Sequence, residues 1–411
     1  MTIQDDTVDT LDRCARMVTR WFQRARSVPL SFFLNIDFEA EFDEDIAHIR
    51  SFLVDISSIM PRVQHFGLHA QLTTELLYSF VGLEWKLPLL KRLDLFSHSR
   101  IDQVNPIAYS VPIFQTAPNL VQVAIQNTIT SAHDVQHILP WSQLTDINMA
   151  YSISVSRWIE VMEMCPKMRV FEVSFNEEDN VWPSSLESYP PKGTHHSLER
   201  LYLDISNGGA FLNLLSLYSF PALRTLHVLY HSEPLLDFPR PKGISLLANL
   251  REFSFSAMGL HFPREHFTYV VEILREMVNL EELELQQATQ DFIPIYEALS
   301  FKQEKAILPR LGTIKLWVSS ESEPGKDEEL EPLFKMLSSR CTEDIVPVGY
   351  KPLEEFFVGV EAEDVHERIS NMFDPWLGRL PPQLRTNIDL SRSYYFDQPE
   401  GWTYPIAIND W

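Results

Sequence analysis

Residues 90–95 read Leu-Lys-Arg-Leu-Asp-Leu, and this six-residue phrase decides the fold because it returns along most of the chain. It contains an apolar residue, two variable residues, a second apolar residue, one variable residue and a third apolar residue. Clear copies begin at Leu90, Leu120, Leu144, Met168, Leu198, Leu223, Leu250, Leu280 and Leu311, and weaker copies begin at Val63 and Leu353. A phrase that returns at a regular interval predicts a repeat architecture.

The interval between the phrases identifies the class of repeat. The ten steps from Val63 to Leu353 cover 290 residues, a mean of 29. Leucine-rich repeats have periods of about 20–29 residues, and longer units carry a full helix on the return leg. Each phrase ends in the alternation of a strand, and helical patterns lie between phrases. We therefore predict an α/β leucine-rich-repeat solenoid (horseshoe) of about eleven β-α units, with a parallel concave sheet and helices on the convex side.

The flanking patterns predict a cover at each end of the solenoid. We expect an N-terminal cap over residues 1–62 (helix 7–26, strand 28–36, helix 43–60), the solenoid over 63–360, and a C-terminal cap over 361–411 (helix 365–373, then an irregular aromatic tail). Between phrases we expect helices over 73–81, 156–165, 210–218, 264–277 and 293–299. The acidic stretch 319–331 predicts an exposed loop that leads into a helix near 332–339.

Composition restricts the classes of partner. The chain has 411 residues and a net charge of −23, from 57 acidic and 34 basic residues. Nucleic-acid binders usually present a basic face, and anionic membranes attract basic segments, so we expect neither partner. Three widely separated cysteines, no Asn-x-Ser/Thr sequon and no signal-peptide pattern predict a cytoplasmic or nuclear protein.

The sequence carries no recognisable catalytic motif. It has no glycine-rich phosphate loop, no Gly-x-Ser-x-Gly elbow and no His-Glu-x-x-His pattern, so we expect no catalytic residue, cofactor or metal. His65 and His69 fall on one strand phrase about 13 Å apart, which is too far for joint ligation. We interpret them as exposed strand histidines, and His195-His196 as part of a solvated turn.

The variable residues of the phrases form rows on the concave face, where a partner would bind. The candidate partner-binding residues are Tyr202, His227, Leu229, Trp317, Lys315, Phe357, Glu252, Glu282 and Glu284. Exposed aromatics mixed with both signs of charge are typical of protein-binding surfaces. The glutamates make the C-terminal half acidic, which suits a basic segment of a protein partner. An alternative remains open, in which several of the aromatics pack under the tail or a neighbouring helix.

Three phrases with their flanks resemble the irregular repeats of F-box leucine-rich-repeat proteins. They are Leu87-Pro-Leu-Leu-Lys-Arg-Leu-Asp-Leu95, Cys165-Pro-Lys-Met-Arg-Val-Phe-Glu-Val173 and Phe220-Pro-Ala-Leu-Arg-Thr-Leu-His-Val228. The stretch Trp21-Phe-Gln-Arg-Ala-Arg-Ser-Val-Pro-Leu-Ser-Phe32 resembles the start of the repeat domain in the large F-box families of mushroom-forming fungi. The resemblance covers roughly residues 8–360 and implies the substrate-recognition half of a ubiquitin-ligase adaptor.

The resemblance does not extend to the F-box itself. In that family an F-box helical bundle precedes the repeats and docks on a Skp-type adaptor, but only 27 residues precede Val28 here. We therefore do not expect a Skp-type partner for this chain. The main hypothesis is a non-enzymatic protein-recognition module, and the alternative is a stand-alone scaffold or regulator, similar to leucine-rich GTPase regulators, with no ubiquitin link.

Overall fold

The structure is a computed structural model that describes most of the chain. The described residues are 2–3, 8–36, 43–70, 80, 82–97, 112–126, 139–175, 192–205, 215–230, 246–257, 264–286, 292–301, 307–318, 327–341, 346–360 and 363–390. The chain divides into two compact units: unit 1 holds residues 1–206 and 213–223, and unit 2 holds residues 207–212 and 224–411. Nothing in the sequence pattern predicted a division inside the repeat array.

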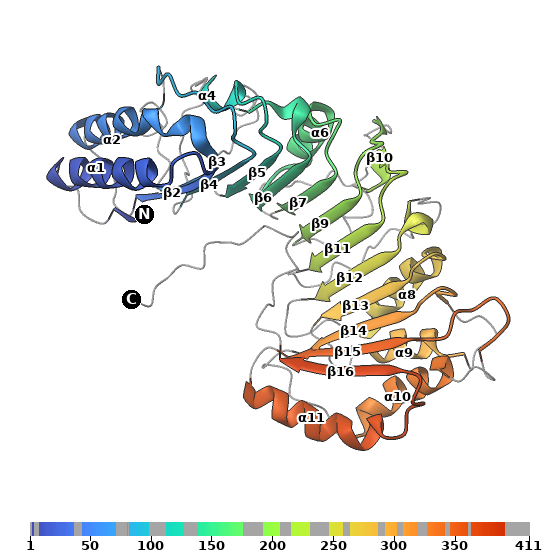
Figure 1. Ribbon diagram of the computed structural model, residues 1–411. Helices are drawn as coiled ribbons and strands as arrows, with labels where there is room; N and C mark the ends of the chain where they lie inside the picture. The colour runs from blue at the N-terminus through green and yellow to red at the C-terminus, as the bar shows by residue number, and fades with distance from the viewer. Residues whose placement is uncertain are drawn as a thin grey trace. The chain divides into compact units, whose positions relative to one another are not determined.

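Unit 1 is built on a parallel sheet whose strands follow one another in chain order (Figure 1). The strands are β1 (Thr2–Ile3), β2 (Leu30–Ile36), β3 (Val63–Ala70), β4 (Arg92–Ser97), β5 (Gln122–Gln126), β6 (Asp146–Ser152), β7 (Val170–Phe175) and β9 (Arg200–Ile205). Its helices are α1 (Val8–Arg24), α2 (Asp43–Asp55), α4 (Pro112–Gln115) and α6 (Val155–Met164), with 3₁₀ turns η1 (Ile56–Ser58), η2 (Met60–Arg62) and η3 (Trp141–Gln143). A separate parallel pair joins β8 (Gly193–Thr194) to β10 (Tyr218–Ser219).

Unit 2 repeats this arrangement of parallel strands and helices. Its parallel strands are β11 (Thr225–Tyr230), β12 (Glu252–Ala257), β13 (Glu282–Gln286), β14 (Thr313–Val318), β15 (Glu355–Val360) and β16 (Arg385–Leu390). The 3₁₀ turn η5 (Leu247–Asn249) precedes the helices α8 (Arg264–Glu276), α9 (Ile293–Leu299), α10 (Asp327–Cys341) and α11 (Glu363–Leu377). Helix α9 packs between α8 and α10, while α11 packs on β15 and β16. The predicted fold class is confirmed.

The apolar residues of the phrase form the core. In each of the eleven phrases the second and third apolar residues lie on a strand, the first lies at its start or just before it, and all three are buried. Phe255 is the most exposed of them, at 6%. Because burying one leucine side chain contributes about 1.5–3 kcal/mol, each phrase supplies several kilocalories of hydrophobic stabilisation that only a neighbouring phrase can complete.

Within each unit, a backbone hydrogen bond joins successive phrases. The residue after the first apolar position donates its N–H to the carbonyl oxygen of the equivalent residue one phrase earlier. In unit 1 the amide of Val121 donates to Lys91 over 3.0 Å, and in unit 2 the amide of Glu281 donates to Arg251 over 2.8 Å. These bonds align equivalent residues, so the variable residues of successive phrases stand in rows across the strands.

A polar residue just before the first apolar position ties neighbouring phrases together. The Asn119 amide donates to the Pro88 carbonyl over 2.6 Å, and the Asn279 amide donates to the Ala248 carbonyl over 2.7 Å. The Ser197 hydroxyl makes the same kind of bond. These side chains satisfy turn carbonyls that the parallel ladder leaves unpaired.

Most of the predicted helices are confirmed, although their bounds differ. The predictions over 7–26, 156–165, 264–277 and 293–299 are confirmed as α1, α6, α8 and α9. Helix α2 ends at Asp55, earlier than predicted. The range 73–81 lies outside the described residues apart from Phe80, and in 210–218 the described part is one helical turn that ends where β10 begins.

The C-terminal region differs more from the prediction. Helix α10 begins at Asp327 rather than near Pro332, because its acidic residues favour the positive end of the helix dipole. After α11 the chain forms β16, which pairs in parallel with β15, where the sequence predicted an irregular tail. Arg385-Thr-Asn-Ile-Asp-Leu390 lacks the apolar spacing of the phrase, so the pattern did not reveal this strand. The predicted aromatic tail after Leu390 lies outside the described residues.

Arg340 is a fully buried cation that holds unit 2 together. Its guanidinium donates to the carbonyl oxygens of Leu299 (2.6 Å), Leu308 (3.1 Å) and Ile307, and it stacks over the Phe301 ring at 4.6 Å. Burial lowers the pKa of Arg340 to about 10, so the group remains charged at neutral pH. Leu299 is the last residue of α9, whose negative end the charge stabilises.

We predict that R340K lowers the free energy of unfolding by about 2–4 kcal/mol, because a single ammonium group cannot reach all three carbonyls and those left unpaired stay buried. Urea denaturation followed by circular dichroism would measure the loss. The matched control is R310K, because Arg310 is exposed and should tolerate the same exchange. Equal stability of the two variants would contradict the role of Arg340.

Candidate functional site

The parallel register of unit 2 brings eight of the nine predicted partner-binding residues onto one set of strands. We call the face that carries the variable residues of β11–β16 the variable face. Its three rows are Thr225, Glu252, Glu282, Thr313, Glu355 and Arg385; His227, Ser254, Glu284, Lys315, Phe357 and Asn387; and Leu229, Ser256, Gln286, Trp317, Gly359 and Asp389. Of the eight predicted residues on this face, only Glu252 is exposed. The other seven side chains are half-buried: His227, Leu229, Glu282, Glu284, Lys315, Trp317 and Phe357.

The ninth residue, Tyr202, corrects the prediction. It lies on β9 of unit 1 rather than among the strands of unit 2, and it is only 4% exposed. The sequence predicted an exposed aromatic at this place. Because it is buried, Tyr202 is not available as a surface contact in this structure. The place of a residue in the phrase does not reveal whether other side chains cover it.

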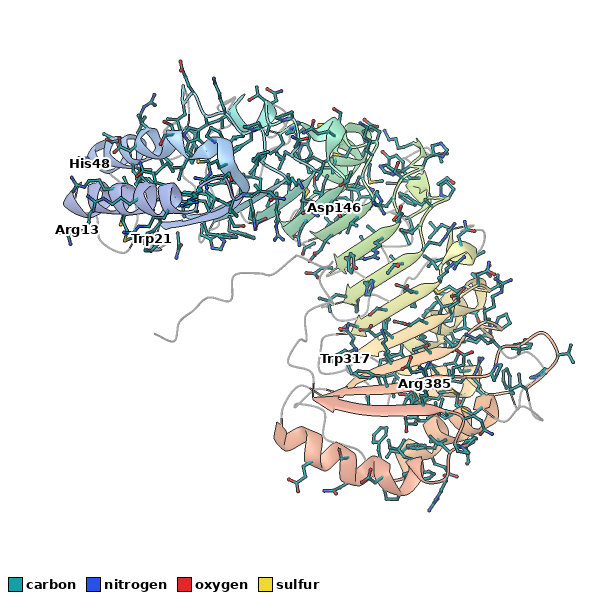
Figure 2. All side chains as sticks on the ribbon, in the orientation of Figure 1. Arg13, Trp21, His48, Asp146, Trp317 and Arg385 are labelled. Carbon is teal, nitrogen blue, oxygen red and sulfur yellow. The ribbon has the colours of Figure 1, made fainter. Side chains whose placement is uncertain are left out.

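Aromatic rings gather where β14 and β15 meet. The rings of Trp317 and Phe357 lie 5.6 Å apart with their planes inclined at 58°. Trp317 also lies across Gly359, where an added Cβ atom would stand 2.3 Å from the ring carbon Cε3. The indole therefore rests directly on the backbone of the next strand. Figure 2 marks Trp317 within unit 2.

Sequence reasoning missed the role of Gly359. The signal was present, because the rows pair Trp317 with Gly359 across β14 and β15. A glycine opposite a large ring gives that ring a flat resting place. Unit 1 uses the same device, where an added Cβ atom on Gly67 would stand 2.4 Å from the Phe33 ring and the register pairs these two residues.

Carboxylates outnumber cations on the variable face, but several already have partners. The Lys315 ammonium lies 2.6 Å from Oε1 of Glu282, and the Arg385 guanidinium lies 4.0 Å from Oε2 of Glu355. Glu252 accepts a hydrogen bond of 2.9 Å from the Thr225 hydroxyl. Four glutamates against Lys315 and Arg385 leave the described face acidic. The sequence did not reveal that Lys315 pairs with Glu282 and so offsets part of this charge.

Several polar atoms of the variable face lie away from solvent without a hydrogen bond. Within the described part of the chain, these include Nε1 of Trp317 and the hydroxyl oxygens of Ser254 and Ser256. The two serines are only 1% exposed, as small residues on β12 between longer side chains of β11 and β13.

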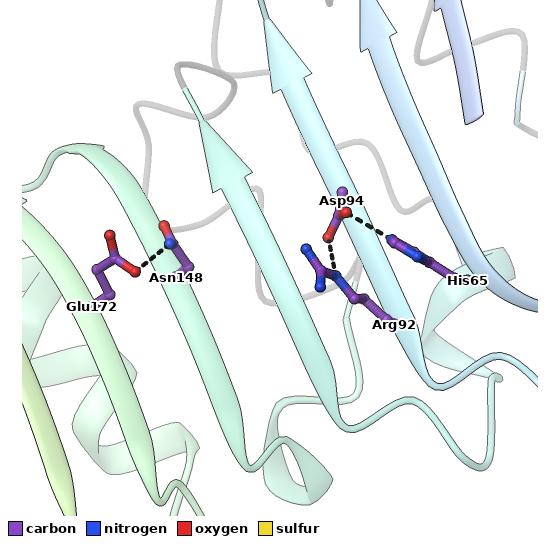
Figure 3. A network of polar contacts seen from close by, with 5 residues as sticks. All are labelled: His65, Arg92, Asp94, Asn148 and Glu172. Carbon is purple, nitrogen blue, oxygen red and sulfur yellow. Dashed lines mark hydrogen bonds and ion pairs between the residues drawn. The ribbon is translucent and has the colours of Figure 1, made fainter. Parts of the chain in front are cut away.

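Unit 1 carries a different polar cluster on the corresponding face (Figure 3). The buried Asp94 carboxylate accepts one hydrogen bond from Arg92 Nε at 2.9 Å and lies 2.7 Å from His65 Nε2. Further along the face, Asn148 donates to Glu172. His65 contacts Asp94 and the Phe33 ring and is half-buried, so it is not the exposed strand histidine that the sequence predicted.

His195 also departs from its expected place in a solvated turn. It is 5% exposed, and its Nε2 lies 2.9 Å from the Cys165 carbonyl oxygen, to which it donates. Desolvation by burial lowers the pKa of His195, so the ring favours its neutral form. Among the described residues, no three His, Cys, Asp or Glu side chains gather as a metal site requires, and no helix is long and apolar enough to cross a membrane.

The two buried cysteines are poorly suited to act as nucleophiles. Burial raises the pKa of Cys165 to about 12 and that of Cys341 to about 12. Both thiols therefore remain protonated at neutral pH, whereas nucleophilic attack and metal binding require the thiolate. Cys14 is half-buried.

The comparisons with known proteins give no family. No protein-family model matches the chain, and no curated protein matches it either. The chain is similar in structure to a Bacteroides fragilis protein, with 13% identity, 76% of this chain and 77% of that chain covered, and a TM-score of 0.40. It is also similar to the leucine-rich repeat-containing protein LegL7 from Legionella pneumophila, with 12% identity, 87% and 90% covered, and a TM-score of 0.40. At these values the fold assignment depends on the strands and register of the chain itself.

We predict that G359A destabilises the protein by about 1–2 kcal/mol, because the added methyl group forces the Trp317 indole off the strand. In a W317A background the same change should be neutral or slightly stabilising, since alanine suits a strand better than glycine. Chemical denaturation of the four proteins gives the coupling energy directly. A coupling near zero would contradict the packing of Trp317 on Gly359.

We also predict that a thiol reagent such as DTNB at pH 8 labels at most one cysteine per native chain, Cys14, and all three in 8 M urea. The reason is the burial and raised pKa of Cys165 and Cys341. Absorbance at 412 nm counts the released thiols. Rapid labelling of two or more cysteines in the native protein would contradict the buried environment of this pair.

Proposed function

We propose that the chain is a non-enzymatic protein-recognition module that binds a partner segment on the variable face of unit 2. The partner would carry basic side chains and at least one apolar side chain. The observation that carries this proposal is the half-exposed ring pair Trp317 and Phe357, which lies beside the glutamates of β13 and β15.

The aromatic pair supports binding because of its geometry. Tryptophan commonly dominates binding energy where it sits in a well-packed centre, and Trp317 is already fixed by Gly359 beneath it. A fixed ring loses little conformational freedom when a partner covers it. Leu229 and His227, on β11 of the same face, extend the surface beyond the rings.

The charge of the face supports a basic partner. Glu252 is exposed, and Glu284 and Glu282 occupy the next strand. Complementary charge steers association and excludes partners of the same sign. Lys315 sets a limit on this complementarity, because it neutralises Glu282 within the protein. A bound arginine or lysine would meet the exposed Glu252 more favourably than Glu282.

The resemblance to F-box leucine-rich-repeat proteins supports a finer proposal, that the bound segment belongs to a substrate of a ubiquitin ligase. The alternative is a stand-alone scaffold or regulator with the same surface and no ubiquitin link. Co-precipitation of a Skp-type adaptor with the natural full-length protein would favour the ligase role, and its absence would favour the scaffold.

The test is a selection of 12-residue peptides displayed on phage against the purified protein, followed by fluorescence anisotropy of the selected peptides. We expect lysine or arginine together with an aromatic or aliphatic residue in the selected sequences. The double variant W317A/F357A should weaken binding at least tenfold, which corresponds to about 1.4 kcal/mol or more. E252K should weaken basic peptides, and the effect should shrink as salt rises.

The matched control is V278A, because Val278 is an exposed apolar residue of unit 2 in the turn after α8, away from the strands. It should leave peptide affinity unchanged. Binding that survives W317A/F357A but falls with V278A would move the site off the variable face. Selected peptides that are uniformly acidic would contradict the basic partner.

A further inference from the structure

A stripe of arginine side chains runs along the solvent side of α1 in unit 1. Arg13, Arg16, Arg20 and Arg24 are all exposed. At 3.6 residues per turn they fall within an arc of about 80° and span about 16 Å of helix. Arg26, in the turn that follows, is exposed as well. The stripe is unusual in a chain whose net charge is −23, and the first 62 residues contain no lysine.

Arg20, Arg24 and Arg26, at the C-terminal end of the stripe, have no acidic partner within the described part of unit 1. Asp9 and Asp12 lie four residues before Arg13 and Arg16, but the sequence places no carboxylate three or four residues from Arg20 or Arg24. Instead Arg16, Arg20 and Arg24 repeat at intervals of four, where like charges destabilise a helix by about 0.2–0.5 kcal/mol per pair. These two repulsive pairs therefore do not stabilise the helix.

Exposed apolar side chains flank the arginines. Trp21 is 57% exposed and Met17 is 37% exposed, one helical turn apart, and Val28 in the following turn is 60% exposed. Figure 2 shows Arg13 and Trp21 on the side of α1 that faces away from α2. Tryptophan, arginine and methionine are enriched at protein interfaces whereas lysine is depleted, and that is the composition of this helix side.

The turn beside the stripe is held in place before any partner binds. The Arg62 guanidinium donates to the Phe22 carbonyl oxygen over 2.6 Å and to the Val28 carbonyl oxygen over 3.1 Å. Arg26 adopts a positive φ of 50°, and the Val28 amide donates to the Ala25 carbonyl oxygen. Trp21 and Val28 are thus presented by a fixed backbone, which lowers the entropy cost of covering them.

We infer that this stripe, Arg13, Arg16, Arg20, Arg24 and Arg26 with Met17, Trp21 and Val28, is a second interaction surface that binds an acidic protein segment. Guanidinium groups bind carboxylates in pairs of parallel hydrogen bonds, and the apolar side chains would cover an aliphatic or aromatic residue of the partner. This surface is independent of the variable face of unit 2.

The charge of the whole chain favours a short acidic segment over an extended polyanion. Without the five arginines of the stripe the remaining net charge is −28, which is −23 minus 5. At physiological salt, charges interact over about 8 Å, so a short segment meets only the stripe. A nucleic acid or an anionic membrane would extend beyond it and meet the acidic remainder.

The test measures binding of three fluorescent probes to the full chain in 50 mM salt: a poly(Glu,Tyr) 4:1 copolymer of about 20 residues, a 20-base-pair DNA duplex, and vesicles with 20% phosphatidylserine. We expect the copolymer to bind most tightly. R20E should weaken it about threefold, in line with one exposed ion pair. The triple variant R16E/R20E/R26E should weaken it at least tenfold, and W21A should also weaken it. R310E is the control for charge reversal at an exposed arginine outside the stripe.

The melting temperature of R20E distinguishes a loss of binding from a folding defect. R20E converts the two repulsive pairs that Arg20 forms with Arg16 and Arg24 into attractive ones, so the melting temperature should stay level or rise while binding falls. Copolymer binding that R20E and the triple variant leave unchanged would overturn the proposal, as would no copolymer binding to the natural protein. Tighter binding of DNA or vesicles than of the copolymer would also overturn it, in favour of a polyanion or membrane surface.

Discussion

The rest of each unit depends on the backbone hydrogen bond between equivalent residues of successive phrases. It sets the register of the parallel strands, and a shift of one residue would turn every apolar side chain to the wrong face. Once the register is set, Leu280, Leu283 and Leu285 must enter the core together, and the residues between them must face outward. The apolar residues of each phrase therefore serve stability, and the variable residues are the ones available for recognition.

The apolar phrase was enough to predict the strands, the core and the fold class, because burial of a period-two pattern depends on local sequence. Features made by distant residues could not be predicted in this way. The burial of Arg340 depends on carbonyl groups from two other segments, and the burial of Tyr202 does not follow from its place in the phrase. Strand β16 pairs through its backbone, so its side chains did not need to follow the phrase.

For the candidate site, the sequence predicted which residues stand in rows, but not how their side chains pair and pack. It placed Trp317 beside Gly359 and Lys315 beside Glu284, and the register confirms both neighbours. It could not show that Lys315 pairs with Glu282, nor that the indole lies flat on the glycine. The two proposed surfaces also differ in construction. The variable face is made by rows of residues across several strands, whereas the arginine stripe lies along the single helix α1.

The pairing of a ring with a glycine constrains how such a protein can diverge. In both units an aromatic side chain rests on the bare backbone of the next strand, at Phe33 with Gly67 and at Trp317 with Gly359. Neither member of a pair can change size alone without disturbing the other. Among relatives, position 359 is free to gain a side chain only where position 317 has lost its ring, so the two positions must evolve as one.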